Sequence, residues 1–508
     1  MSTDAPTPAP TPSDPGGGPQ IGADEWVRRS GERTGGSKGV VGFLNRVADR
    51  TPHILLLLAF LGFACAIPFL TSNGYVIGVA TDTMLYVLLA MGLNVAVGWA
   101  GMLDLGYVIF YGFAAYLFAE LSSAHYGIHW ATWQSVPFVI ACTILLGFVL
   151  SLPSLRLSGD YFAIVMLFFL EIFNNFTANG YTWNWFGLGS PHDITGGPTG
   201  ITNIDPWRFF GHALDPNNAQ NYLWVASAGV FVIAILLAYV NKARTGRAWR
   251  ALREDPLAAN LMGMPVKWLG LLAIAVGAGV AGFAGTVNAS YYQGVFPDAF
   301  TLQLLITIYA MVILGGAGSL GGVIFGAVAI NVMLEVLTTP NHARWVFYAA
   351  VLLGLVAKVR PWKVLAAVLG GLVAFGLIAH QVVEAVWARG VGGPIAMGPT
   401  SYTTHGFFAT LIRQWMVLPK GTYENADYRI GNYAFVIVIA MVLTCTVLKG
   451  WKRYVLLVPT IWGAAFVWET DLVNQGPTTR YLLLGLLLIG LMATRPNGIF
   501  GQQRVEIV

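Results

Sequence analysis

The sequence predicts an all-α polytopic membrane protein, and three observations lead to that fold class. Of its 508 residues, 56% are hydrophobic and 10% are charged, with a mean hydropathy of +0.65. Soluble domains carry about 25% charged residues. Apolar runs long enough to cross a bilayer recur along the chain, and positive charge is concentrated in alternate loops. We therefore expect roughly 11–14 transmembrane helices, including broken or re-entrant segments.

Residues 1–50 are predicted to form a cytoplasmic tail. The segment 2–20 is rich in Pro, Gly and Thr, and a basic stretch leads on to Arg50. Such a segment cannot bury enough apolar surface to fold, so we expect disorder. The apolar run from His53 to Phe69 has the basic flank of a signal peptide, but it is nearly of membrane length and a second run follows at once. We interpret it as the first span.

Apolar runs of about 17 residues define the candidate spans. Two of them, at 302–317 and 320–338, are separated only by a glycine-rich turn, so this pair is a candidate for a broken or re-entrant element. The fourteen candidates lie at residues 54–71, 75–98, 103–121, 133–153, 159–176, 222–241, 266–291, 302–317, 320–338, 345–359, 363–388, 431–449, 453–470 and 479–494.

The distribution of Lys and Arg predicts how these spans are oriented. With a cytoplasmic N-terminus, the inside segments hold about three times as many Lys and Arg residues as the outside loops. The loop 242–267 holds six of them, as many as the N-terminal tail. This bias predicts that both termini and the loop 242–267 are cytoplasmic, and that the long polar loops 177–221 and 390–430 lie outside.

The segment from Thr245 to Lys267 is the most polar interruption of the apolar body, and it predicts a compact folded loop. Asp255 followed by Pro256 is typical of a helix N-terminus. Gly263, just before a proline, is typical of a helix end. We therefore expect a short helix over residues 256–262.

Two interpretations of this short helix stay open on the loop alone. Leu257 and Leu261 share one face, while Ala258 and Ala259 offer a patch that another backbone can approach closely. The helix is then either a docking element for a partner protein or a basic helix lying at the lipid surface.

Ionisable and amide side chains inside apolar runs are costly and are therefore candidates for a substrate pathway. Near one of them, Asp104, three glycines interrupt the helical pattern, and broken helices expose backbone groups that line a path for a polar solute. A helix cap or an interfacial carboxylate is the alternative for each residue. The candidates are Asp82, Asn94, Asp104, Asp160 and Glu171.

Small residues and an internal repeat speak to the architecture. Ala278/Gly282 and Ala281/Gly285 recur four apart, which suits close helix packing in a membrane. The stretch 344–363 resembles the stretch 480–499, each with an arginine outside, here Arg344 and Arg480, then one span and an Arg-Pro stop inside.

The repeat suggests a division of the chain. We interpret residues 51–360 as the core with the loop 242–267, and 361–479 as an accessory membrane block with an outside loop at 390–430. Residues 480–508 would form a final span and a cytoplasmic C-terminus.

Chemistry on a covalent bond is not expected. Cys65, Cys142 and Cys445 all lie inside apolar runs, where a thiol behaves as a small hydrophobe. Zinc-type spacings, a nucleophile elbow, a P-loop and a dinucleotide fingerprint are absent from the sequence in any supporting context. The sequence therefore predicts no enzyme, no metal site and no cofactor.

Six stretches of the chain follow one another in an order typical of a known family. They are GLNVAVGWAGMLDLGYVIFYGFAAY (92–116), LRLSGDYFAIVMLFFLEI (155–172), DITGGPTGI (193–201), GRAWRALREDPLAANLMGMPV (246–266), VILGGAGSLGGVIFGA (312–327) and RPNGIFG (495–501). Together they resemble the LivM-like permease subunits of branched-chain amino acid ABC importers. The resemblance covers about residues 54–340 and the last crossing, and it leaves out the Pro-rich tail and the block 361–479.

The resemblance implies a coupling role for the cytoplasmic loop, which is similar to the motif that docks on the ATP-binding subunit in that family. Ala258, Ala259 and Gly263 match the Ala-Ala and Gly positions, whereas Leu257 stands where the family has glutamate. The coupling residues expected from this likeness are Arg250, Glu254, Asp255, Pro256, Leu257, Ala258, Ala259, Met262 and Gly263.

The resemblance also implies partners. The chain itself would bind no ATP, and it would pair with a second permease subunit, two ATP-binding subunits and an extracytoplasmic amino-acid-binding protein in a bacterial plasma membrane. The turn-rich outside loop is the candidate surface for the binding protein, and a plain turn-rich loop is the alternative. Its candidate contact residues are Thr195, Gly196, Gly197 and Pro198.

The sequence leaves three other functions open. Permeases for urea or short amides are similar in sequence. A secondary transporter or channel would work without an ATPase, although neither paired intramembrane charges nor symmetric halves are clear. A membrane scaffold without transport activity rests only on the block 361–479.

Overall fold

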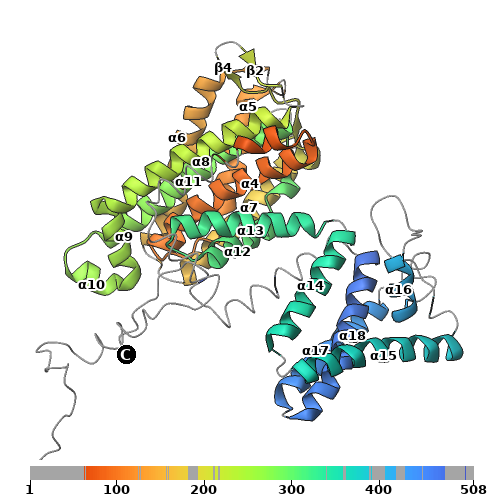
Figure 1. Ribbon diagram of the computed structural model, residues 1–508. Coiled ribbons are helices and arrows are strands. Elements are labelled where there is room, and N and C mark those ends of the chain that lie inside the picture. Colours follow the sequence, from red (N-terminus) through yellow and green to blue (C-terminus); the bar gives the residue numbers. More distant parts are fainter. Residues whose placement is uncertain are drawn as a thin grey trace, which may run out of the picture. The chain divides into compact units, whose positions relative to one another are not determined.

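The computed structural model describes the chain from Gly62 onward with gaps, within the second of the two units into which the chain divides, residues 57–508 (Figure 1). The predicted tail 1–50, most of the first span and most of the last span lie outside the described residues. Those described are 62, 65–123, 125, 127–155, 157, 160–180, 193–209, 212–215, 218–338, 340–358, 362–387, 391, 407–418, 429–448, 450–474, 485 and 498.

The fold class is confirmed, because helices form most of the described structure. Among the described residues, seven helices are long and apolar enough to cross a membrane, and four shorter apolar helices accompany them. The helices up to residue 336, which we call the core bundle, are α4 (Gly74–Leu93), α5 (Tyr107–Leu121), α6 (Thr132–Ser151), α7 (Asp160–Asn179), α8 (Ala219–Lys242), α9 (Arg244–Glu254), α10 (Pro256–Leu261), α11 (Val266–Tyr292), α12 (Leu302–Gly315) and α13 (Leu320–Val336).

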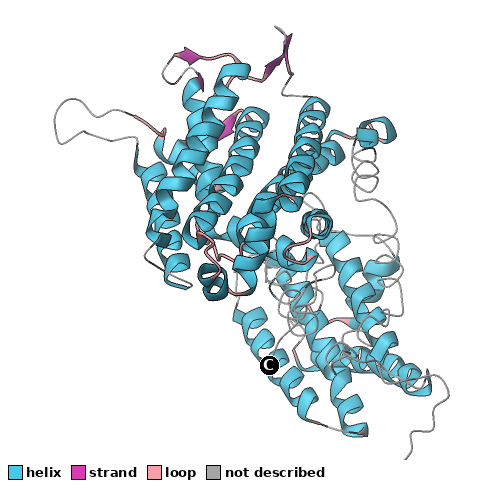
Figure 2. Cartoon of the chain, turned by 90° about the vertical axis from the view of Figure 1, so that its left-hand side faces the viewer, coloured by secondary structure: helices cyan, strands magenta, loops and turns pink. Residues whose placement is uncertain are grey.

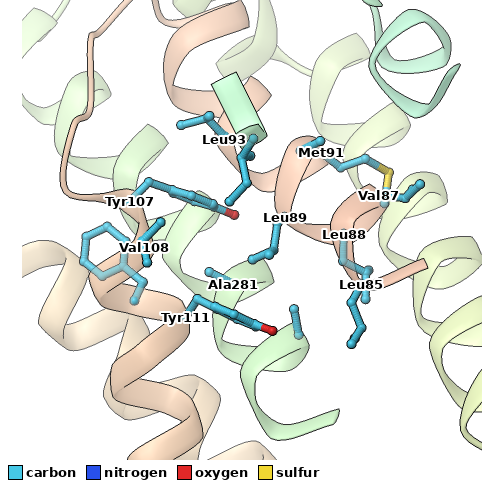
Figure 3. Close-up of a cluster of buried hydrophobic side chains, with 14 of the residues drawn as sticks. Leu85, Val87, Leu88, Leu89, Met91, Leu93, Tyr107, Val108, Tyr111 and Ala281 are labelled. Carbon is cyan, nitrogen blue, oxygen red and sulfur yellow. The ribbon is translucent and has the colours of Figure 1, made fainter. Parts of the chain in front are cut away.

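The bundle is organised around α11, which packs against α4, α5 and α6. Its small residues allow this, since a Cβ on Gly277 would lie 2.9 Å from the Gly92 carbonyl oxygen of α4. Leu89 and Ala281 lie with aromatic rings of α5 in one buried cluster (Figure 3). The predicted close packing at Ala278/Gly282 and Ala281/Gly285 is confirmed, because all four residues are buried.

The helix that begins with α4 changes its winding before it ends. Residues Asn94–Trp99 form a π-helical turn, η1, and an irregular stretch with Gly101 at φ +71° leads to α5. Such turns insert an extra residue into the helical ladder and are frequent at functional sites. The predicted span 103–121 therefore begins later than expected, at Tyr107.

The pair predicted as broken or re-entrant forms two short helices, α12 of 14 residues and α13 of 17 residues. α12 and α13 pack tightly on each other, joined by a turn in which Gly316 and Gly318 have positive φ. The φ of +95° at Gly318 favours glycine, and a Cβ there would lie 2.6 Å from Arg253 Nη1, so a larger residue would also displace this arginine.

Short strands gather at the end of the core bundle opposite α10 (Figures 1 and 2). They pair β1 with β2, β3 with β6 and β4 with β5, all antiparallel. Their bounds are β1 (Ser122–Ser123), β2 (Ile128–His129), β3 (Ile201–Thr202), β4 (Arg208–Phe209), β5 (His212–Ala213) and β6 (Gly294–Val295), with 3-10 turns η2 (Leu152–Leu155), η5 (Gly197–Thr199) and η6 (Pro297–Ala299) elsewhere in the core.

The later helices form small separate clusters, and we call them the accessory helices. α14 packs on α18 through Ala343 and Trp468, and Phe347 stacks on the same tryptophan at 5.0 Å. Their bounds are α14 (Pro340–Lys358), α15 (Trp362–Val386), α16 (Phe407–Trp415), α17 (Arg429–Val447) and α18 (Trp451–Asn474).

Two sequence-based expectations about this region differ from the structure. The outside loop 390–430 contains a helix, α16, whose nine residues are too short to have been recognised as a span. Arg344, expected in an outside loop, is buried within α14 and donates from Nε and Nη2 to the two carboxylate oxygens of Glu469, at 2.7 and 2.8 Å.

Candidate functional site

The polar loop after α8 folds into two short helices, α9 and α10. α9 is amphipathic and buries Trp249 and Leu252 against the bundle. The Trp249 indole donates to the Leu269 carbonyl oxygen at 2.8 Å and stacks on Trp99 with ring centroids 6.3 Å apart. The loop is thus anchored both to α11 and to the π-helical turn η1.

The predicted start and end of α10 are confirmed. The Asp255 carboxylate accepts hydrogen bonds from the backbone N–H groups of Leu257 and Ala258, at 2.8 and 3.0 Å. Pro256 occupies the first helical position. Gly263 has a φ of +81°, the left-handed conformation that favours glycine after a helix.

The exposed face of α10 is apolar. Leu257, Leu261 and Met262 are 71%, 79% and 82% exposed. Large apolar side chains clustered this way on a polar loop mark a surface that meets a partner or a membrane.

The two alanines of the expected docking patch face different ways. Ala258 is exposed, whereas Ala259 is 3% exposed and packs inside the chain. The expectation that both alanines present a surface to another backbone is therefore wrong for Ala259. A helical repeat places neighbouring residues about 100° apart, so a pair i, i+1 does not share a face.

Arg250 and Glu254 of α9 are exposed, as a contact with a partner requires. Arg250 Nη2 donates to the Asn241 carbonyl oxygen at 3.3 Å, which holds the side chain near the C-terminal end of α8.

Arg253, which the sequence did not single out, joins the loop to two irregular stretches of backbone. Its Nη1 donates to the Gly98 carbonyl oxygen of η1 and, at 3.4 Å, to the Ala317 carbonyl oxygen of the α12–α13 turn. Gly101 leaves room for it, because a Cβ there would lie 2.9 Å from Arg253 Cγ. The sequence offered one signal, an arginine just before the predicted start of the short helix 256–262, but not its partners 155 and 64 residues away.

Asn94 lies at the same junction and is fully buried. Its Oδ1 accepts from the Gly318 N–H at 2.8 Å, and the Trp99 indole donates to the Gly318 carbonyl oxygen at 3.0 Å. One residue of the α12–α13 turn is thus held by two side chains of η1. Asn94 therefore ties two helices together here.

Asp104 is also fully buried and stabilises the irregular stretch before α5. Its Oδ1 accepts from the Gly106 N–H at 3.0 Å, and Tyr309 of α12 donates to its carbonyl oxygen at 2.7 Å. The structure brings Asn94 and Asp104 to the same end of the bundle, on either side of the break in the helix. These contacts favour the alternative that Asp104 caps a helix.

The other two pathway candidates do not join them. Asp160 is the first residue of α7, and its side chain lies outside the described residues. Glu171 lies on the exposed face of α7, where Asn175 Nδ2 donates to it at 3.2 Å.

A cavity of about 470 Å³ opens between α4, α5, α11, α12 and α13 toward the strand end of the core bundle, and we call it the outer cavity. Of its polar residues only Asp82 was singled out from the sequence. Glu335 also lies within a predicted span, 320–338, and carried the same signal of an acidic residue in an apolar run, but it was missed. Its polar lining residues are Asp82, Tyr86, Tyr111, Asn288, Tyr292, Asn331 and Glu335.

The loop that holds the candidate binding-protein contacts lies at the strand end of the core bundle. Thr195 is buried and donates to the Thr177 carbonyl oxygen at 2.8 Å, and Gly196 and Gly197 have positive φ. Pro198 is exposed, so among the four candidates it is the one that presents its side chain to a partner. Strand β3, just after this turn, pairs with β6, which lines the outer cavity.

Membrane-length helices, a folded polar loop anchored at one end and a polar cavity at the other define a transport permease. A sequence profile described as "Branched-chain amino acid transport system / permease component" matches residues 75–356, and the chain belongs to this family.

The relatives agree. The chain is 35% identical over 331 residues to "High-affinity branched-chain amino acid transport system permease protein LivM" of Salmonella typhimurium, which covers 61% of this chain and 73% of the relative. The LivM protein of Escherichia coli (strain K12) gives the same values. The LivH permease of Salmonella typhimurium is 27% identical over 113 residues, 22% of this chain and 36% of that protein. No solved structure gives a significant match.

Proposed function

We propose that this permease subunit serves an ATP-driven importer for branched-chain or related amino acids. It works with a second permease, two ATP-binding subunits and an extracytoplasmic binding protein. The names of the LivM and LivH relatives support the substrate class and the second permease. ATP hydrolysis is assigned to the partner subunits.

The observation that carries the proposal is the loop α9–α10, which is exposed on one face and anchored on the other. Leu257, Leu261 and Met262 are free to dock on an ATP-binding subunit, while Arg253 and Trp249 connect the same loop to η1. A displacement of α10 is therefore passed through α9 to η1, the turn that continues α4.

The α4 helix offers a route from the loop to the outer cavity. Asn94 at its inner end holds the α12–α13 turn, and Asp82 lines the cavity about 18 Å further along the same helix. Closure of the ATP-binding subunits would move η1 and the α12–α13 turn as one body and change access to the cavity.

The proposed orientation places α10 and both termini in the cytoplasm of a bacterial cell and the strands outside its plasma membrane. It rests on the three-to-one excess of Lys and Arg in the predicted inside segments. A membrane-impermeant thiol reagent should label Met262→Cys only after permeabilisation of cells that carry an otherwise cysteine-free chain.

The docking test uses one charge at two positions of α10. Leu261→Asp places a carboxylate in the exposed apolar face, and Asn260→Asp places the same charge on a residue that is already polar and exposed. We expect Leu261→Asp to reduce co-purification of the ATP-binding subunits about tenfold or more, and Asn260→Asp to leave it nearly unchanged.

The proposal fails if Leu261→Asp retains the ATP-binding subunits and leucine uptake at the wild-type level. Uptake of labelled leucine, in competition with unlabelled urea and acetamide, separates the amino acid importer from an importer of urea or short amides.

A further inference from the structure

The outer cavity contains more negative charge than its surroundings compensate. Asp82 on α4 and Glu335 on α13 both line it, and none of its described lining residues is Lys, Arg or His. Carboxylates inside a bilayer are costly unless a cation or hydrogen-bond donors satisfy them.

Each carboxylate accepts a hydrogen bond from a tyrosine, which uses only part of its hydrogen-bonding capacity. Tyr292 donates its hydroxyl to Asp82 Oδ1 at 2.7 Å, and Tyr75 donates its hydroxyl to Glu335 Oε1. A carboxylate has about four lone-pair sites on its two oxygens. These two tyrosines orient the carboxylates and leave acceptor sites for a further donor.

The rest of the cavity suits a small amphiphilic molecule. Leu85, Leu89 and Leu304 supply an aliphatic wall, while Asn288 supplies an amide. Asn331 is held in place, because its Nδ2 donates to Thr83 Oγ1 at 2.8 Å. A volume of about 470 Å³ lies within the range of about 300–1,000 Å³ found for small-molecule sites.

We infer that the outer cavity is a binding site for the substrate within the permease itself, and that Asp82 and Glu335 receive the ammonium group of an aliphatic amino acid. The inference rests on the proposed importer function and adds the chemical group that the permease recognises. An ammonium group offers three hydrogen-bond donors and a positive charge, which match the acceptors left on the two carboxylates.

The position of the cavity fits a molecule delivered from outside. β6 and η6 form the edge of the cavity. β6 pairs with β3, and β3 directly follows the exposed turn at Pro198. A binding protein seated on that turn would release its ligand beside the cavity.

The test measures binding of labelled L-leucine to the complete transporter in lipid nanodiscs, without the binding protein. Competitors are isoamylamine, which keeps the amine and lacks the carboxylate, and 4-methylpentanoate, which keeps the carboxylate and lacks the amine. We expect isoamylamine to compete and 4-methylpentanoate not to compete. Asp82→Asn and Glu335→Gln should each weaken leucine binding about tenfold, because each removes one charged acceptor.

The matched control is Glu384→Gln, an exposed acidic residue of α15 outside the cavity. The inference is overturned if the wild-type transporter binds no leucine, if 4-methylpentanoate competes as well as isoamylamine, or if both cavity variants keep the wild-type Kd.

ATP hydrolysis stimulated by the loaded binding protein is measured on the same wild-type samples. If it persists while leucine binding is absent, the site inference fails and the importer function stands. If the ATP-binding subunits do not associate at all, the importer function fails.

Discussion

The core bundle and the accessory helices are both apolar, but they are held together in different ways. In the core, 78% of the residues in the most apolar stretch of α11 are buried within the chain, and 72% of those in α4 together with η1. The corresponding share for α15 in the accessory helices is 17%. The core forms one continuous cluster of buried apolar residues, whereas the accessory helices form small separate clusters. The core therefore depends on close backbone approach, and the accessory helices depend on a few aromatic and charged contacts.

The family profile and the side-chain contacts place the boundary between the core and the accessory helices at different residues. The family profile extends to residue 356, near the end of α14. The contacts of Arg344 and Tyr348 on α14, however, are made with Glu469 on α18. We propose that α14–α18 form one accessory unit, so a deletion of 361–479 would leave Arg344 without its carboxylate.

The largest effect is expected in the accessory helices, where one buried ion pair joins α14 to α18. Glu469→Gln leaves the Arg344 charge buried opposite a neutral amide and should destabilise the protein by about 3–5 kcal/mol. Thermal unfolding of the purified protein measures this loss. The double variant Arg344→Met/Glu469→Leu removes both charges and should recover most of the stability. A double variant no more stable than the single one would contradict this account.

The next effect tests the connection between the loop and the core. Arg253→Ala removes charged hydrogen bonds to two backbone carbonyls, worth about 1.5–3 kcal/mol each. We expect leucine uptake to fall about tenfold while the ATP-binding subunits still co-purify. Arg247→Ala, which removes an exposed arginine of the same helix, is the control and should transport normally. Equal leucine uptake by the two variants would contradict the proposed role of Arg253 in connecting the loop to the core bundle.

A single alanine placed in each region separates their packing directly. A Cβ on Gly285 of α11 would lie 2.5 Å from the Tyr111 carbonyl oxygen and 2.9 Å from Ala114 Cβ, so Gly285→Ala should cost about 1–3 kcal/mol. Nothing lies within 4 Å of the corresponding position on Gly370 of α15, and Gly370→Ala should stabilise by up to about 1 kcal/mol through helix propensity. Unfolding temperatures of both variants check the opposite signs.

The smallest effect concerns the start of α10. Asp255→Ala removes the side-chain cap on two backbone N–H groups and should cost about 1 kcal/mol, confined to this helix. Faster hydrogen exchange at Leu257 and Ala258 would report the loss, while exchange in α11 stays slow. Asp255→Asn keeps a capping oxygen and should behave like the wild type. Global destabilisation by the alanine variant would show that the loop is more tightly coupled to the core than we infer.

The sequence by itself determined what depends on neighbouring residues. Hydropathy located the spans, because each is a local run that must satisfy its own backbone in a bilayer. The cap at Asp255 and the stop at Gly263 predicted α10, since capping acts over three or four residues. The ordered motifs identified the family, which the profile over residues 75–356 confirms.

Tertiary structure decided which side chains meet. Gly318 and Asn94 are 224 residues apart, and Tyr292 and Asp82 are 210 apart, yet each pair is joined by a hydrogen bond. The inward direction of Ala259 was also fixed only by packing of the loop on the bundle. Hydropathy and capping patterns are averages over a few neighbours, whereas these contacts follow from which helices pack together, so the outer cavity and the Arg253 connection emerge only in three dimensions.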